Sequence, residues 1–262
     1  MLGQVIIAKT LNEKDKQSKK YLNNSLIMPI NKPYAMINGV RTLKFDGFDD
    51  IIQCALQTQA ILVALNSDKL YYSDPRLKQI INNNIGYCDG VGAVWALSKK
   101  GVKGAVKIAG CELWLEIIKR YPTKKYYLIG AEETVIVEVV KRLKLEFPHI
   151  NIVGFRNGFL KSEKEKETLI KNIVTQQPDF VFVAMGSPKQ EYILEEIHKI
   201  YPVPMMGLGG SFNVFSGKAK RAPKWMITMK METLYRYLFN KISFKRIKSD
   251  FKFMYMLISN KL

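Results

Sequence analysis

The sequence predicts an α/β fold: a Rossmann-like, mostly parallel β-sheet with helices on both faces, followed by a basic helical appendage at the C-terminus. Short, continuously apolar runs alternate with longer stretches of helical periodicity, a pattern typical of parallel strands buried on both sides. The chain has 262 residues, 47% of them hydrophobic, which is enough for a sizeable core. Basic residues gather near the C-terminus and set that end apart from the sheet domain.

Three segments follow from this pattern. Residues 1–33 are expected to form an N-terminal extension, because they contain a charged run at Asn12–Lys20 and then a segment with two prolines. Residues 34–216 carry the alternating strands and helices of the α/β domain. Residues 217–262 form the basic appendage.

The elements of the α/β domain are expected in strict alternation. Each strand is a run of apolar residues, and each helix shows apolar residues three or four positions apart. The first of the helices has Asp74 directly before it as a capping residue. The expected strands are Ala60–Leu65, Ile85–Cys88, Lys125–Ile129, Ile150–Phe155, Phe180–Met185 and Met205–Leu208, and the expected helices are Pro75–Asn83, Cys111–Tyr121, Glu133–Phe147, Glu163–Gln176 and Lys189–Ile200.

Polar and glycine residues follow several of these strands. Ligands of open parallel sheets bind beyond the carboxyl ends of the strands, so these positions are where we expect chemistry. They are Asn66, Asp89-Gly90, Gly130-Ala131, Gly186-Ser187-Pro188 and Gly209-Gly210.

The segment from Gly186 to Glu191 joins a strand to a helix. Its glycine allows close approach to the backbone, and the helix N-terminus attracts phosphate or sugar oxygens. Ser187 belongs to the same turn, Lys189 adds a positive charge, and Gln190 offers both a donor and an acceptor. An ordinary strand–helix turn with proline in the first turn explains the segment equally well.

Two further strand ends have competing explanations. The run Gly207–Ser211 is rich in glycine, but it matches neither a phosphate-binding Gly-Lys-Ser/Thr loop nor a dinucleotide fingerprint, and a tight turn is as good an explanation. Asp89 could take a proton from a substrate hydroxyl. From the residues alone, a turn-forming Asp-Gly pair is the better explanation of Asp89.

The residue types predict neither a metal site nor a cofactor. The segment from Asp46 to Asp50 is acidic but does not form an Asp-x-Asp motif, and the chain has two histidines. Cys54, Cys88 and Cys111 are far apart in the sequence and show no metal-binding spacing, so they are expected to be reduced core residues.

Charge is the most informative property of the composition. The formal net charge is +18, and residues 217–262 hold twelve Lys and Arg residues against Glu232 and Asp250. Aromatic residues lie between these cations, a mixture that suits an anionic membrane surface. It also suits single-stranded nucleic acid, or a helical pair that docks on its own domain with a basic outer face. The membrane surface is the favoured of the three.

Neither a signal peptide nor an apolar run of 18 residues occurs in the sequence. The chain is therefore expected in the cytoplasm, peripheral on the inner face of the cell membrane. Formation of a homo-oligomer is left open.

The ordered motifs resemble those of the WecG/TagA/CpsF glycosyltransferases (glycosyltransferase family 26), from about Met36 to Arg246. Each motif is weak alone, and their order and spacing together carry the resemblance. The motifs are Phe182–Glu191, Gly207–Phe212, Gly217 with Arg221–Trp225, and Glu232–Arg236.

The resemblance implies an inverting, metal-independent transfer of an N-acetylmannosamine-type or related sugar. The donor would be a UDP-sugar and the acceptor an undecaprenyl-diphosphate-linked sugar of a surface polysaccharide or teichoic acid. The resemblance places the catalytic base at Asp89. The donor-binding positions would be Asn66, Lys107, Gly130, Gly186, Ser187, Lys189, Gln190, Glu191, Gly209, Gly210 and Asn213, and the diphosphate- or acceptor-binding positions Arg221, Arg236 and Arg246.

The chain departs from the family pattern where donor sugar and diphosphate would be held. Ala64 replaces a threonine, Lys107 an arginine, Asn213 an aspartate and Ser243 an arginine. A lysine lacks the bidentate geometry of arginine. These departures keep open a catalytically inactive nucleotide-sugar-binding protein, and the basic tail leaves a nucleic-acid-binding protein as a weaker alternative.

Overall fold

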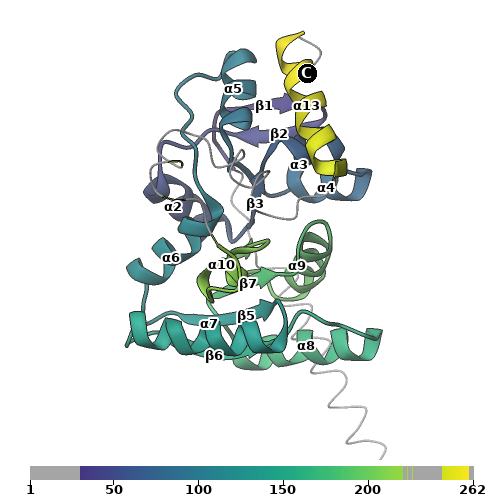
Figure 1. Cartoon of the computed structure of the whole chain (residues 1–262). Helices are drawn as coiled ribbons and strands as arrows, with labels where there is room; N and C mark the ends of the chain where they lie inside the picture. The colour runs from purple at the N-terminus through teal and green to yellow at the C-terminus, as the bar shows by residue number, and fades with distance from the viewer. Residues whose placement is uncertain (1–29, 221–222, 224–225, 227–243, 260–262) are drawn as a thin grey trace, which may run out of the picture.

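The computed structural model describes residues 30–220, 223, 226 and 244–259. Its centre is an eight-stranded sheet of order β1-β2-β4-β3-β8-β7-β5-β6, in which β1 is antiparallel to β2 and all other neighbours are parallel (Figure 1). The α/β fold with a mostly parallel sheet is therefore confirmed. The strands are β1 (Tyr34–Ile37), β2 (Val40–Leu43), β3 (Ile61–Leu65), β4 (Ile85–Cys88), β5 (Lys125–Gly130), β6 (Asn151–Arg156), β7 (Phe180–Ala184) and β8 (Met205–Gly207).

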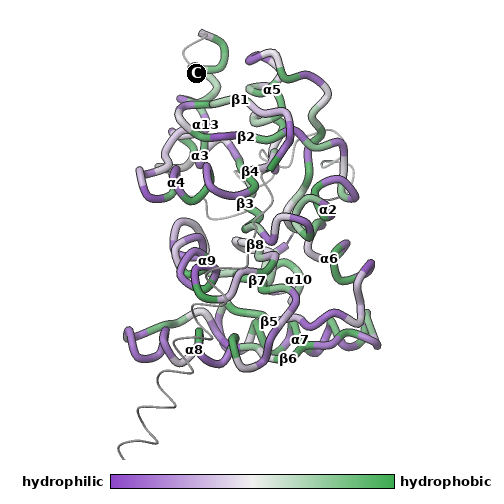
Figure 2. Tube along the Cα trace, turned by 180° about the vertical axis from the view of Figure 1, so that it is seen from behind, coloured by the Kyte–Doolittle hydropathy of each residue, from purple (hydrophilic) through white to green (hydrophobic). Residues whose placement is uncertain are grey.

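Helices cover both faces of the sheet, as two separate hydrophobic clusters show. The first cluster contains residues of α2 (Phe48–Thr58), α6 (Gly110–Arg120), α7 (Glu133–Glu146) and α10 (Ser211–Phe215). The second contains residues of α3 (Ser67–Tyr72), α4 (Pro75–Asn82), α5 (Val91–Lys99), α8 (Glu163–Gln176), α9 (Lys189–Ile200) and α13 (Phe244–Ile258). Figure 2 shows hydrophilic and hydrophobic residues alternating along α8, as expected for a helix with one face on the core.

The central strands explain why apolar residues run without interruption in the sequence. In β7, Phe180 and Phe182 point into the first cluster, while Val181 and Val183 point into the second. Successive side chains of a strand point to opposite faces, so a strand covered on both sides needs apolar residues at every position.

All of the expected strands and helices are present, and no end differs from its expected position by more than one residue. The sequence did not predict the β1–β2 hairpin or helices α2, α3, α5 and α10. The hairpin turns at Asn38 and Gly39, which have φ values of 50° and 77°. An Asn-Gly pair is the usual signal for such a turn, and the strands on either side are only four residues long.

The described part of the appendage packs on the α/β domain. Helix α13 lies against α3 (Figure 1), and its Phe253 and Leu257 are buried in the second cluster. Lys99 at the end of α5 donates a hydrogen bond to the Ile258 carbonyl at 3.2 Å. Among the described helices, none combines the length and the apolar character that a bilayer crossing needs.

Candidate functional site

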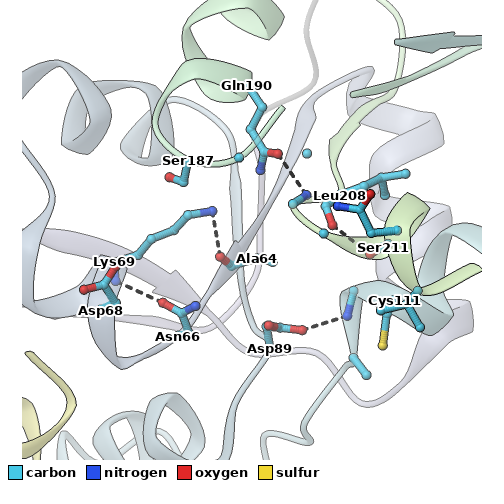
Figure 3. Close-up of a pocket in the computed structure, with 18 of the residues that line it drawn as sticks. Ala64, Asn66, Asp68, Lys69, Asp89, Cys111, Ser187, Gln190, Leu208 and Ser211 are labelled. Atoms are coloured by element: carbon cyan, nitrogen blue, oxygen red, sulfur yellow. Dashed lines mark hydrogen bonds between the residues drawn. The ribbon is translucent and has the colours of Figure 1, made fainter. Parts of the chain in front are cut away.

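A cavity of about 560 Å³ lies beyond the carboxyl ends of β3, β4, β7 and β8 (Figure 3). These four strands are neighbours in the middle of the sheet, and the first two belong to the N-terminal half of the domain while the last two belong to the C-terminal half. The residues that line the cavity come from the strand ends, from the starts of α3, α6, α9 and α10, and from the segment that follows α10. This is where the ligands of open parallel sheets are expected.

Asp89 lies directly after β4 and lines the cavity. Its Oδ1 accepts a hydrogen bond of 2.7 Å from the backbone N–H of Gly110, the first residue of α6 (Figure 3). Its own backbone N–H donates to the Leu65 carbonyl at 3.0 Å. The carboxylate is thus held at the N-terminus of α6, where the helix dipole is positive.

Tyr87 lies in β4, two residues before Asp89, and is not among the residues that line the cavity. Its hydroxyl is buried, with no hydrogen-bond partner among the described residues. Burial raises the pKa of Tyr87 well above its usual value, and the nearby Asp89 and Cys111 add to this effect. The tyrosine hydroxyl therefore stays neutral beside Asp89.

Gln190 lines the opposite side of the cavity and is fixed at both ends of its amide. The Oε1 atom accepts a hydrogen bond of 2.9 Å from the backbone N–H of Gly209, and Nε2 donates one of 2.9 Å to Glu191. An ideal Cβ on Gly207 would lie 2.6 Å from the Gln190 Nε2 atom. A side chain at position 207 would therefore force the Gln190 amide to move.

A buried ion pair supports Gln190. Lys69 Nζ lies 2.7 Å from Glu191 Oε1, with 9% of the lysine side chain and 1% of the glutamate side chain exposed. The lysine also donates to the Ala64 carbonyl at 3.1 Å, and its backbone N–H donates to Asn66 Oδ1 at 3.0 Å (Figure 3). Burial acts to raise the pKa of Glu191, but Lys69 and the Gln190 amide outweigh it and lower that pKa.

The structure brings together most of the expected site residues and leaves others apart. Besides Asp89 and Gln190, the cavity is lined by Asn66, Lys107, Gly186, Ser187, Gly209, Gly210 and Asn213. Gly130, Lys189 and Glu191 are not among its lining residues. Arg221 and Arg236 fall outside the described residues, as does the side chain of Arg246.

Five polar residues line the cavity without having been expected there: Asp68, Lys69, Cys111, Ser211 and Lys220. Of these, Asp68, Lys69 and Ser211 follow strand ends closely, so the rule that located Asp89 could have found them. Cys111 was expected in the core. That expectation is wrong, because Cys111 is half-buried at the start of α6 while Cys54 and Cys88 are buried.

The described residues hold no group of three or more His, Cys, Asp or Glu side chains that could bind a metal ion. The cations that line the cavity within the described part are Lys69, Lys107 and Lys220. Lys69 is engaged with Glu191. The chemistry available from these residues is a carboxylate base, backbone and amide hydrogen bonds, and lysine charges.

Comparison with known proteins places the site in context. The model of the family described as "Glycosyl transferase WecG/TagA/CpsF family" matches residues 37–262. Two curated relatives are both named N-acetylglucosaminyldiphosphoundecaprenol N-acetyl-beta-D-mannosaminyltransferase. The one from Bacillus spizizenii is 36% identical over 63% of this chain and 65% of its own length. The one from Bacillus subtilis is 36% identical over 62% of this chain and 63% of its own length.

The match thus spans just under two thirds of either relative. A mutant arylmalonate decarboxylase of known structure aligns over 69% of this chain and 81% of its own at 14% identity, with a TM-score of 0.27, which is too weak to inform the function.

Proposed function

Because the chain belongs to the WecG/TagA/CpsF glycosyltransferase family, we propose that it transfers a sugar from a UDP-sugar to an undecaprenyl-diphosphate-linked acceptor, with inversion and without a metal ion. The observation that carries the proposal is the pairing of Asp89 and Gln190 across one cavity at the centre of the sheet. The names of the two relatives make an N-acetylmannosamine donor and an N-acetylglucosamine-bearing acceptor the first pair to test. The product would serve the synthesis of a surface polysaccharide or teichoic acid.

In this mechanism Asp89 is the general base. The Gly110 N–H holds Oδ1, and Oδ2 receives the proton of the acceptor hydroxyl. The deprotonated oxygen attacks the anomeric carbon of the donor as the bond to UDP breaks, and the bonding electron pair leaves on the diphosphate. Attack from the face opposite the leaving group inverts the anomeric centre.

The charge that develops on the leaving diphosphate needs cations and hydrogen-bond donors. Lys107 and Lys220 are the lining cations beside the Lys69–Glu191 pair. Arg221, Arg236 and Arg246 would complete the group from the appendage. The Gly209 N–H is already donated to Gln190, so the backbone near Gly210 and the turn at Gly186 are the better places for phosphate or sugar oxygens.

The direct test is a screen of UDP-sugars for UDP release in the presence of a synthetic prenyl-diphosphate N-acetylglucosamine. Release that depends on both donor and acceptor, and that persists in the presence of a chelator, is the expected result. UDP binding without release from any donor would favour a catalytically inactive nucleotide-sugar-binding protein. Failure to bind any uridine nucleotide would reject the proposal.

The appendage would bring this site to the membrane on its cytoplasmic side. Helix α13 buries Phe253 and Leu257 in the domain and exposes the opposite stripe, which consists of Phe251, Tyr255 and Ile258. Phe251 is 70% and Tyr255 64% exposed. These residues lie at positions i, i+4 and i+7, and Lys248 and Lys252 are close to them in sequence, an arrangement suited to the interface of an anionic bilayer.

Sedimentation with anionic liposomes tests this role without truncating the chain. Replacing Phe251 and Tyr255 by serine should lower the bound fraction several-fold. The matched control replaces Val137 and Leu145, which are exposed apolar residues of α7, and should bind like the unmodified protein. Equal binding by all three proteins would reject a membrane role for α13, and salt-sensitive binding to oligonucleotides instead would favour the nucleic-acid alternative.

A further inference from the structure

The residues around Gln190 form a continuous network that joins three strand ends. The network starts at the end of β3, where Ala64 and Asn66 hold Lys69. It passes through the Lys69–Glu191 pair to α9, which follows β7, and reaches the end of β8 through Gln190 and Gly209.

The polar groups of this network are buried, so keeping them away from water is costly. Gln190 and Glu191 are 2% and 0% exposed, and Glu191 Oε2 has no hydrogen-bond partner among the described residues. A buried ion pair is costly to desolvate, and replacing it with apolar residues is often neutral or even stabilising. Stability is therefore a poor explanation for a buried Lys–Glu pair beside a ligand cavity, and positioning is a better one.

The geometry of Gln190 shows what is positioned. An amide has two chemically different ends, and the side chain can be reversed unless its partners differ. Here Oε1 must face a donor, the Gly209 N–H, and Nε2 must face an acceptor, the Glu191 carboxylate. Lys69 keeps that carboxylate charged and in place, so the choice of amide orientation depends on a lysine that comes from the other half of the sheet.

We propose that Lys69 and Glu191 are positioning residues whose buried ion pair orients the Gln190 amide and holds the ends of β3, β7 and β8 at the spacing that the UDP part of the donor requires. This inference rests on the proposed function only for the identity of the ligand. The pair acts on the donor indirectly, by positioning Gln190 and the glycine-rich strand end. It takes no part in proton transfer.

Two double variants separate positioning from stability. In K69M/E191Q both charges are removed, but residue 191 keeps a carbonyl oxygen that can accept from Gln190. In K69M/E191M both charges and that acceptor are removed. Because neither variant leaves an unpaired buried charge, both should fold, with melting temperatures within about 5 °C of each other.

The expected result is a large difference in donor affinity at similar stability. By calorimetry, K69M/E191M should bind UDP at least about tenfold more weakly than K69M/E191Q, and its donor KM should rise by a similar factor. Arg76→Met is the matched control, because it breaks the exposed pairs of Arg76 with Glu195 and Glu196 on the same helix α9. Its UDP affinity should equal that of the unmodified protein.

A third variant, Gly207→Ala, disturbs the Gln190 amide while leaving the charges of Lys69 and Glu191 intact. Its Cβ would lie 2.6 Å from Gln190 Nε2, so the amide must move, and UDP affinity should fall as it does in K69M/E191M. Equal UDP affinity in both double variants and in Gly207→Ala would overturn the inference. So would losses of affinity that follow melting temperature alone across the set, since that result would assign the pair a purely structural role.

Hydrogen exchange keeps the inference testable if the proposed function fails. The Gly209 amide donates to Gln190, so exchange across the peptide 205–211 reports whether that bond is kept, without any ligand. Exchange at least about tenfold faster in K69M/E191M than in K69M/E191Q supports the network even if no UDP-sugar is turned over. Equal exchange in the two variants rejects the network regardless of activity.

Discussion

Asp89 and Gln190 face one cavity from its two sides, and the protein holds them in different ways. The Asp89 carboxylate is fixed through one oxygen by a backbone N–H at the start of α6. Gln190 is held at both ends of its amide by groups that are themselves held, Gly209 and the Glu191–Lys69 pair. A base must keep an oxygen available for a proton, whereas a positioning group gains from having its orientation fully determined.

The largest expected effect comes from Asp89→Asn. Asparagine keeps an oxygen that can accept from Gly110 but loses the capacity to take a proton. Turnover should fall by roughly a hundred- to ten-thousand-fold, while UDP affinity in calorimetry stays within about twofold. Unchanged turnover would remove Asp89 from the role of base, and a parallel loss of UDP binding would assign it to the donor site instead.

The second-largest effect is expected from substitutions of Gln190, on the other side of the cavity from Asp89. Gln190→Leu keeps the approximate volume but leaves the Gly209 N–H and the buried Glu191 without their amide partner. Donor KM should rise by about tenfold to a hundredfold, because a buried polar group left unpaired costs about 1–3 kcal/mol. Gln190→Glu is a useful companion, since its added charge beside Glu191 should weaken donor binding further. A change in kcat with unchanged donor KM would contradict a positioning role for this residue.

A smaller effect is expected where α6 meets Asp89. A Cβ on Gly110 would lie 2.9 Å from the Tyr87 hydroxyl and 3.5 Å from Asp89 Oδ1. Gly110→Ala should therefore shift the carboxylate, lower kcat by about tenfold and cost about 1–3 kcal/mol of stability. Adding Tyr87→Phe removes the hydroxyl and should restore most of both losses. If the double variant is no better than the single one, the contact with Tyr87 is not the cause.

The smallest effect concerns the far end of α9, where His198 Nε2 lies 2.6 Å from the Gln59 carbonyl. Burial lowers the pKa of His198 below its ordinary value of 6.5, although the Gln59 carbonyl acts in the opposite direction. With a lowered pKa in the folded state, protons bind the unfolded chain first as the pH falls below 6.5, so stability decreases.

Melting curves at pH 7.5 and pH 5.5 measure this effect. The melting temperature should fall between pH 7.5 and pH 5.5, and His198→Gln should make this fall smaller by about 2–4 °C. His149→Gln removes an exposed histidine and should leave that loss unchanged. The same loss in all three proteins would show that α9 docking does not depend on the protonation of His198.

The sequence alone determined the alternation of the fold and pointed to the strand ends where the cavity lies. Apolar runs such as Phe180–Met185 predict strands covered on both faces, and Asp89 and Gly186 were located by following such strands to their carboxyl ends. These signals are local, because they depend on side-chain periodicity and on turn residues. The hairpin of β1 and β2 was not predicted, although its Asn38-Gly39 pair carries a local turn signal.

Only the tertiary structure decided which residues meet. Lys69 and Glu191 are 122 positions apart, and nothing in the spacing of either predicts the other, because their contact depends on β3 and β8 being neighbours in the sheet. The pairing of β7 with β8 brings Gln190 to Gly209, and it places Gly207 directly against the Gln190 side chain. Chemistry at strand ends could be read from the sequence, whereas the network that orients it arises from the order of the strands.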